Sequence, residues 1–199
     1  MSGPKIVVGL GNPGSKYDRT RHNVGFDAID RLVSGLPGFR FANRFDSEVA
    51  EIEIDFRKVL VVKPTTFMNA SGKAVSGIVR FYKIPLEDLV VICDDLSLPL
   101  GRVRIRPGGG DGGQKGLRDI ARVLGTDRFP RMRIGIGDRG LMDAADFVLA
   151  KFRPSELKVL EDGLLTAIQA IGVWASRDLE TAMNRFNGPS DPHAPATKS

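Results

Sequence analysis

Apolar and polar positions along the chain follow two different periods, one typical of strands and one typical of helices. Runs of consecutive apolar residues predict buried strands, whereas residues 47–54 alternate polar with apolar positions, as a half-exposed strand does. The predicted strands cover residues 5–10, 47–54, 59–62, 89–93, 101–106 and 131–136. The predicted helices cover residues 23–33, 71–82, 116–124, 155–175 and 178–185. This alternation of strands and helices predicts an α/β fold around one central sheet.

The length of the chain and the composition of its end set the outline of the domain. A chain of 199 residues can bury one sizeable core, so we expect residues 1–186 to form a single domain. Ser155 follows Pro154 and is expected to cap the N-terminus of the long helix. Residues 187–199 are rich in Pro, Ser, Ala and Lys, which predicts a disordered tail.

Three features predict a cytoplasmic protein without a membrane span. No apolar run approaches the roughly 20 residues that cross a bilayer. The first five residues lead directly into an apolar strand and lack the three regions of a signal peptide. The single cysteine, Cys93, excludes an internal disulfide, as is usual for proteins of reducing compartments.

The basic residues are concentrated in one part of a chain whose net charge is +5. Residues 101–133 contain eight arginines and Lys115 but only three aspartates, a surplus of six positive charges. Such a surplus can attract phosphate groups. An arginine-rich surface that only contacts solvent is the alternative, and charge alone does not decide between the two.

Two glycine-rich segments carry signals for phosphate binding. Residues 9–14 match G-x-G-x-x-G after a strand, which is the dinucleotide-binding pattern. The acidic residue expected after a second strand is missing, because residues 23–33 read as a helix. A nicotinamide-dependent or flavin-dependent oxidoreductase would rest on this pattern alone. Residues 108–113 form a second loop that either approaches a phosphate closely or is a mobile surface loop, and it lacks the K-[ST] of a nucleotide-binding P-loop.

Candidates for acid–base chemistry are few. The chain has two histidines, and His193 falls in the expected tail, so His22 must supply any imidazole that acts near neutral pH. Its alternative role is to cap a helix. Asp94 and Asp95 follow a buried strand, and one of these carboxylates could orient an imidazole, or both could simply form a turn. Asn69, after another strand, offers a donor and an acceptor or caps the next helix. Ser97 lacks a G-x-S-x-G context, and neither the histidines nor the cysteine have metal-site spacing.

Taken together, the order of these motifs resembles that of bacterial-type peptidyl-tRNA hydrolases. The motifs are V-G-L-G-N-P-G, T-R-H-N-V-G-F, P-T-T-F-M-N-x-S-G, D-D-L-x-L-P-x-G, the glycine-rich loop and R-I-G-I-G, and they span residues 5–186. The resemblance implies a monomer with a mixed, twisted central sheet flanked by helices. It implies no metal or organic cofactor, and peptidyl-tRNA as the partner, from which the enzyme recycles tRNA after stalled or aborted translation.

The resemblance also assigns residues to the site. It makes His22 the catalytic histidine and Asp94 the carboxylate that orients it. It places a basic clamp on the tRNA 5′ phosphate at Arg106 and Arg133. The expected substrate-binding residues are Asn12, Tyr17, Met68, Asn69 and Lys115.

The sequence departs from the family pattern after the glycine-rich loop. The family usually reads H-N-G, then a hydrophobic residue, then K or R, where this chain reads Gln114-Lys115-Gly116-Leu117-Arg118. The family's asparagine, which is thought to contact substrate, is therefore Lys115 here. Either another group replaces its hydrogen bond, or Lys115 binds a phosphate instead.

These assignments lead to one mechanistic hypothesis and one alternative. In the hypothesis, His22, held by Asp94, removes a proton from water as the water attacks the ester carbonyl. Asn12, Asn69 and loop amides then bind the peptide backbone and the developing oxyanion. The alternative is a non-catalytic RNA-binding protein on the same fold, which would use the arginines but not His22.

Overall fold

The structure, a computed structural model, describes residues 3–188 and contains a seven-stranded sheet within that range. The strands are β1 (Lys5–Gly9), β2 (Ala42–Arg44), β3 (Ser47–Ile54), β4 (Arg57–Pro64), β5 (Leu89–Asp95), β6 (Val103–Arg106) and β7 (Arg131–Gly135). Their order in the sheet is β2-β3-β4-β1-β5-β7-β6. Strands β4, β1, β5 and β7 run parallel, whereas β2, β3 and β6 are each antiparallel to a neighbour. The expected mixed sheet is therefore confirmed.

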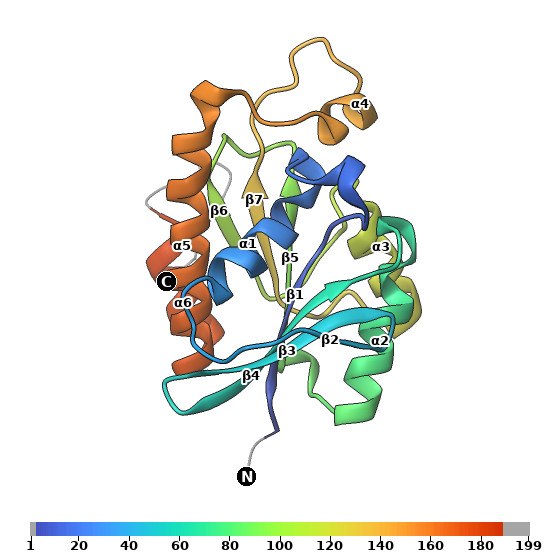
Figure 1. The fold of residues 1–199 in the computed structure, drawn as a ribbon, viewed down its shortest axis with the longest axis vertical. Coiled ribbons are helices and arrows are strands. Elements are labelled where there is room, and N and C mark those ends of the chain that lie inside the picture. The colour runs from blue at the N-terminus through green and yellow to red at the C-terminus, as the bar shows by residue number, and fades with distance from the viewer. Residues whose placement is uncertain (1–2, 189–199) are drawn as a thin grey trace, which may run out of the picture.

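Helices cover both faces of this sheet (Figure 1). They are α1 (Val24–Val33), α2 (Ser71–Tyr82), α3 (Lys115–Leu124), α4 (Ala144–Leu149), α5 (Leu157–Ser176) and α6 (Leu179–Phe186). Helices α1, α5 and α6 share a core with one face, and α2 and α3 share a core with the other. Helix α4 lies beyond the end of the sheet. Among residues 3–188, none of the helices is both long and apolar enough to cross a bilayer.

The central strands are covered on both faces, which explains why their sequences are continuous apolar runs. In β1, Val7 belongs to the core that includes α1 and α5, whereas Ile6 and Val8 belong to the core that includes α2 and α3. Successive side chains of a strand point to opposite faces, so a strand covered on both sides needs apolar residues at every position. The sheet interior therefore follows from the sequence pattern.

The start of α5 differs from the expectation. A 3-10 turn, Pro154–Glu156, precedes the helix, and the residue that caps this turn is Arg153 rather than Ser155. The Arg153 N–H donates to the Glu156 carboxylate at 2.6 Å, and Pro154 occupies the first position of the turn. Ser155 is the second residue of this turn, so the prediction that it is the cap is wrong. The turn begins one residue earlier, at Pro154, because proline has the backbone angle that a first helical residue needs and lacks the N–H that would need a partner there.

The short elements and one boundary also escaped the sequence pattern. Strand β2 and helix α4 were not predicted, because three and six residues are too few to display a period. Asn187, expected in the tail, accepts a hydrogen bond from the N–H of Ile105 at 2.7 Å and donates one to its carbonyl at 3.1 Å. The folded part thus extends to Asn187 on the edge of β6. Gly188 is the last described residue, and residues 189–199 of the expected tail lie outside the described residues.

The parallel strands bring four loops to one edge of the sheet. β1, β4, β5 and β7 all end there, and the loops that follow β1 and β4 carry Asn12 and Met68. Asp94 and Asp95 are the last two residues of β5. Carboxyl ends of parallel strands are the usual ligand-binding edge of an open α/β sheet, so the functional site is expected at this edge.

Candidate active site

A cavity of about 640 Å³ opens at this edge of the sheet. It lies between the loop after β1, the loop after β4, the start of α3, and α4. It brings together all the predicted catalytic and substrate-binding residues, namely Asn12, Tyr17, His22, Met68, Asn69, Asp94 and Lys115. The two predicted phosphate ligands, Arg106 and Arg133, are not among the residues that line it.

His22 and Asp94, the His22–Asp94 pair below, are in direct contact. Nδ1 of His22 lies 2.9 Å from Oδ2 of Asp94, and the two side chains are 12% and 4% exposed. His22 belongs to a 3-10 turn ahead of α1, and α1 has no side-chain cap, so the alternative role of His22 as a helix cap is wrong. Because the carboxylate engages Nδ1, Nε2 is the ring nitrogen left for chemistry in the cavity.

Arg21 attaches the turn that carries His22 to the opposite wall of the cavity. Its guanidinium is buried and donates to the carbonyl of Ile136 at 2.7 Å and to Glu156 at 2.7 Å. The guanidinium also lies 4.4 Å from the ring centre of Phe147, in α4, and 4.7 Å from that of Phe152. A buried guanidinium stacked on two rings and paired with a carboxylate holds its neighbours firmly, so Arg21 links His22 to α4.

Asn12 is held so that its amide N–H groups remain available. The Asn12 N–H donates to Oδ1 of Asn23 at 2.9 Å, and Asn23 returns a hydrogen bond to the Asn12 carbonyl at 3.0 Å. Oδ1 of Asn12 accepts from the N–H of Met68 at 2.8 Å. This acceptor role identifies the oxygen of the amide, so Nδ2 of Asn12 is left as a donor beside the cavity.

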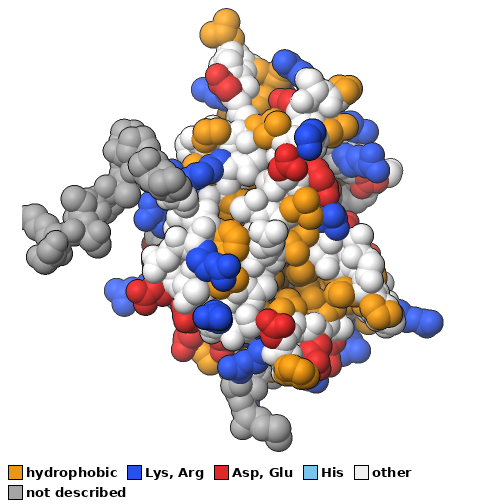
Figure 2. All heavy atoms as spheres, turned by 90° about the vertical axis from the view of Figure 1, so that its left-hand side faces the viewer, with side chains coloured by type: hydrophobic (Ala, Val, Ile, Leu, Met, Phe, Trp, Pro, Cys, Tyr) orange, Lys and Arg blue, Asp and Glu red, His pale blue; other side chains and the backbone are white. Residues whose placement is uncertain are grey.

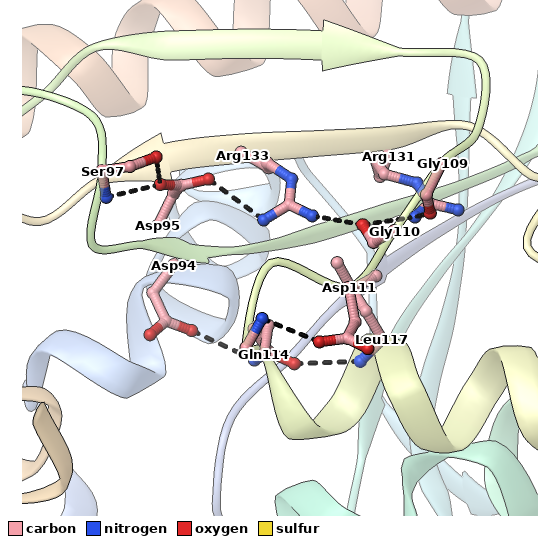
Figure 3. Close-up of polar contacts among 11 residues, drawn as sticks. Asp94, Asp95, Ser97, Gly109, Gly110, Asp111, Gln114, Leu117, Arg131 and Arg133 are labelled. Atoms are coloured by element: carbon pink, nitrogen blue, oxygen red, sulfur yellow. Dashed lines mark hydrogen bonds and ion pairs between the residues drawn. The ribbon is translucent and has the colours of Figure 1, made fainter.

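Gln114 contacts the second carboxylate oxygen of Asp94, opposite the one that His22 uses. Its Nε2 lies 3.1 Å from Oδ1 of Asp94 and 3.1 Å from the sulfur of Met68, and Figure 3 shows the contact with Asp94. Its Oε1 accepts from the N–H of Leu117 at 2.9 Å and so caps α3. Sequence reasoning assigned no role to Gln114, although the departure from the family pattern at this position was a signal.

Two buried arginines of β7 hold the glycine-rich loop (Figure 3). Arg133 donates to the carbonyl of Gly110 at 2.8 Å and pairs with Asp95 at 3.0 Å, while Arg131 donates to the carbonyls of Gly109 and Gly110. The side chains of Arg133 and Asp95 are 10% and 8% exposed. Residues 108–113 thus form a surface loop that these hydrogen bonds tether to β7. Part of the basic surplus of residues 101–133 lies inside the protein.

The other predicted binding residues lie on the surface of the cavity or outside it. Asn69 and Lys115 are exposed and line the cavity, and Asn69 does not cap α2, whose N-cap is Ala70 without a side-chain bond. Tyr17 packs edge-on against Phe67 with ring centres 6.4 Å apart, so the two rings form one aromatic wall. Arg106 is half-buried at the end of β6.

Other chemistries find less support in the described residues. Burial and the neighbouring Asp94 raise the pKa of the Cys93 thiol, so this cysteine stays protonated and is a poor nucleophile. The loop after β1 leads into a 3-10 turn, Ser15–Tyr17, rather than the helix whose N–H groups hold a dinucleotide pyrophosphate. No group of three or more His, Cys, Asp or Glu side chains placed to hold a metal ion occurs within residues 3–188.

Comparison with known proteins identifies the family. The family profile described as peptidyl-tRNA hydrolase matches residues 6–194. The chain belongs to this family. It is 47% identical over 187 residues to a peptidyl-tRNA hydrolase of Rhodopirellula baltica, with 94% of this chain and 98% of the relative covered. It is 48% identical over 185 residues to one of Chloroflexus aggregans, with 92% and 98% covered.

A solved structure agrees with the fold. The crystal structure of the peptidyl-tRNA hydrolase from Acinetobacter baumannii is 34% identical and has a TM-score of 0.87. The match covers 94% of this chain and 96% of that one. The resemblance inferred from the order of motifs and the predicted α/β fold are therefore confirmed.

Proposed function

We propose that the protein hydrolyses the ester bond that joins a peptide to tRNA, with His22 as the general base and Asp94 as its partner. The observation that supports this proposal is the 2.9 Å contact between Nδ1 of His22 and Asp94 in the cavity of a chain that belongs to this family. An imidazole that a buried carboxylate orients through Nδ1 has Nε2 free to accept a proton. The pair is thus suited to activating water.

The reaction then needs a single proton acceptor. Nε2 of His22 takes a proton from water as the water oxygen attacks the ester carbonyl, which gives a tetrahedral oxyanion. When this intermediate collapses, the bond to the ribose oxygen breaks and the imidazolium returns its proton to that oxygen. The products are a free carboxylic acid and a tRNA hydroxyl. Asp94 stays ionised and stabilises the imidazolium. General-base help of this kind contributes about 10²–10⁴-fold to the rate.

The oxyanion needs donors that are already in place. Nδ2 of Asn12 is such a donor, because the contact of Oδ1 with the Met68 N–H fixes the orientation of the amide. Asn69 lines the same cavity and provides a second amide for the peptide or the oxyanion. Donors that are held before the reaction stabilise developing charge without reorganisation.

The tRNA end is expected on the side of the cavity where Lys115 lies. Lys115 is the first residue of α3, so its ammonium group adds to the partial positive charge of that helix end. Phosphates of the tRNA backbone would be attracted there and to Arg106.

Figure 2 shows a different face of the molecule, on the α5 side, where basic and acidic side chains are interspersed. That face lacks the single sign of charge that nucleic acids favour.

His22→Ala tests the proposal. The variant is expected to lose about 10²–10⁴-fold in kcat while it still binds peptidyl-tRNA, because the phosphate contacts remain. Binding and cleavage are followed together on a gel with labelled peptidyl-tRNA. His193→Ala is the matched control, since His193 is the other histidine of the chain, and it should behave as wild type. Near-normal cleavage by His22→Ala would overturn the proposal. Binding without cleavage by the wild-type protein would instead favour the non-catalytic RNA-binding alternative.

A further inference from the structure

Gln114 joins the start of α3 to the His22–Asp94 pair. Its side chain is 5% exposed, and its amide uses both ends: Oε1 caps α3 through the Leu117 N–H, and Nε2 reaches Oδ1 of Asp94. Since His22 occupies Oδ2, the Asp94 carboxylate is held at both oxygens. A carboxylate with a partner at each oxygen cannot rotate without losing a hydrogen bond.

Hydrogen-bond chemistry determines which way the Gln114 amide points. The N–H of Leu117 is a donor and requires the amide oxygen, while the Asp94 carboxylate is an acceptor and requires the amide nitrogen. Turning the amide over would place two donors together at Leu117 and two acceptors together at Asp94. The orientation in Figure 3 is therefore the one that satisfies both partners.

The glycine-rich loop brings Gln114 to this position. Carbonyl oxygens of the loop accept from Arg131 and Arg133, and Arg133 is in turn paired with Asp95, the neighbour of Asp94 in β5. At the far end of the loop, the N–H of Gln114 donates to the carbonyl of Asp111 at 3.1 Å. The loop is thus anchored to β7 and, through Arg133, to Asp95 beside Asp94 in β5, so it places Gln114 reproducibly.

We propose that Gln114 is a positioning residue for the hydrolysis: its amide holds the Asp94 carboxylate so that Oδ2 stays directed at Nδ1 of His22. This inference rests on the proposed function of the His22–Asp94 pair. A neutral amide suits the task, because it supplies a hydrogen bond without cancelling the charge of Asp94. A cation in its place would share the carboxylate's charge and weaken its hold on a protonated imidazole.

Two substitutions separate this role from the helix cap. Gln114→Met has a similar length but removes both hydrogen bonds. Gln114→Glu keeps an oxygen for the Leu117 N–H but replaces the donor to Asp94 with a second carboxylate. We expect kcat at pH 8 to fall by about 10–100-fold in both variants, the loss that matches one hydrogen bond to a charged group. KM should stay within about twofold, because Gln114 acts on the pair rather than on bound tRNA.

The dependence on pH gives a result that a purely structural role would not produce. A protonated glutamic acid can donate to Asp94, whereas methionine cannot. The kcat of Gln114→Glu relative to wild type should therefore rise as the pH is lowered from 8 to 5.5, and the relative kcat of Gln114→Met should stay constant. Wild-type kcat for Gln114→Glu at pH 8, or the same pH response in both variants, would overturn the inference.

A spectroscopic measurement reads the geometry without relying on turnover. Full-length protein with ¹⁵N-labelled histidine gives signals from two imidazoles, and His22→Ala assigns them. Gln114→Met should reduce the fraction of His22 that carries its proton on Nδ1, and an unchanged fraction would count against the role. Turnover by His22→Ala would remove the proposed function itself. An inactive His22→Ala with normal kcat in Gln114→Glu would remove only the role of Gln114.

Discussion

Replacement of Arg133 distinguishes the phosphate clamp expected from the sequence from the internal role that its contacts indicate. Arg133→Met keeps most of the length and apolar surface of the side chain but removes its charge. The substitution leaves Asp95, 8% exposed, without the cation that lies 3.0 Å away, and leaves the Gly110 carbonyl without a donor. The variant should therefore be less stable than wild type, whether or not Arg133 also contacts tRNA.

The size of the effect follows from the burial of the pair. Removing one partner of a buried ion pair costs about 3–5 kcal/mol, because the remaining charge is left uncompensated. Asp95 retains hydrogen bonds from the N–H and hydroxyl of Ser97, at 2.7 and 2.5 Å, so we expect the lower end of that range. For a chain of this length, about 3 kcal/mol corresponds to a melting temperature lowered by roughly 6–12 °C.

Thermal and urea unfolding, followed by circular dichroism, measure this loss. Arg128→Met is the matched control, because Arg128 is exposed in the same basic stretch, and it should leave the melting temperature unchanged. Adding Asp95→Asn to Arg133→Met should restore part of the stability, since the uncompensated charge is then removed. A wild-type melting temperature for Arg133→Met, together with a raised KM and a weaker dependence on salt, would refute the internal role and support the clamp.

Three further predictions follow from other parts of the structure. A Cβ on Gly25 would lie 2.4 Å from the backbone nitrogen of Leu10, so Gly25→Ala should lower the free energy of unfolding, measured in urea, by about 1–3 kcal/mol. A Cβ on Gly77 would have its nearest atom at 3.7 Å, so Gly77→Ala should raise the free energy of unfolding by up to about 1 kcal/mol. Equal values for the two variants would show that the close approach of α1 to β1 is unimportant. Burial, followed by the charge of Asp30, raises the pKa of Asp27 to about 7. The folded state therefore holds a proton that the unfolded state releases, and stability falls as pH rises from about 4 to 7. Asp27→Asn should accordingly be more stable than wild type at pH 8, by up to about 4 kcal/mol, and this gain should vanish near pH 4. Urea unfolding that shows the same gain at both pH values would contradict the prediction. Lys115→Asn should raise KM for peptidyl-tRNA and lower the salt dependence of binding by about one counterion, and an unchanged salt dependence would exclude a phosphate contact.

Much of the fold could be predicted from local patterns in the sequence. The apolar runs of the central strands mark positions covered on both faces, and the loops after those strands carry Asn12, Asn69 and Asp94. Because parallel strands end at one edge, these loop residues converge once the strands are parallel. The order of motifs then added His22, which local patterns alone would have left as a helix cap.

The burial of Arg133 and the role of Gln114 depended on the tertiary structure. Arginines that alternate with apolar residues in β7 look like one basic exposed face, yet Arg131 and Arg133 are buried under the glycine-rich loop. An alternating pattern records only that two kinds of residue face opposite ways, and it does not record what covers each face. The loop that covers the arginines begins more than twenty residues earlier in the chain.

The sequence by itself thus determined the α/β class, the edge of the sheet where ligands bind, and the family to which the chain belongs. These properties reside in local periodicity and in motifs that are contiguous along the chain. The tertiary structure alone decided two contacts: Gln114 with Asp94, 20 positions apart, and Arg133 with Asp95, 38 positions apart. The contact of His22 with Asp94, 72 positions apart, was expected only from the resemblance to the family. Such contacts depend on strand order and on the path of the connecting loops, which no local pattern encodes.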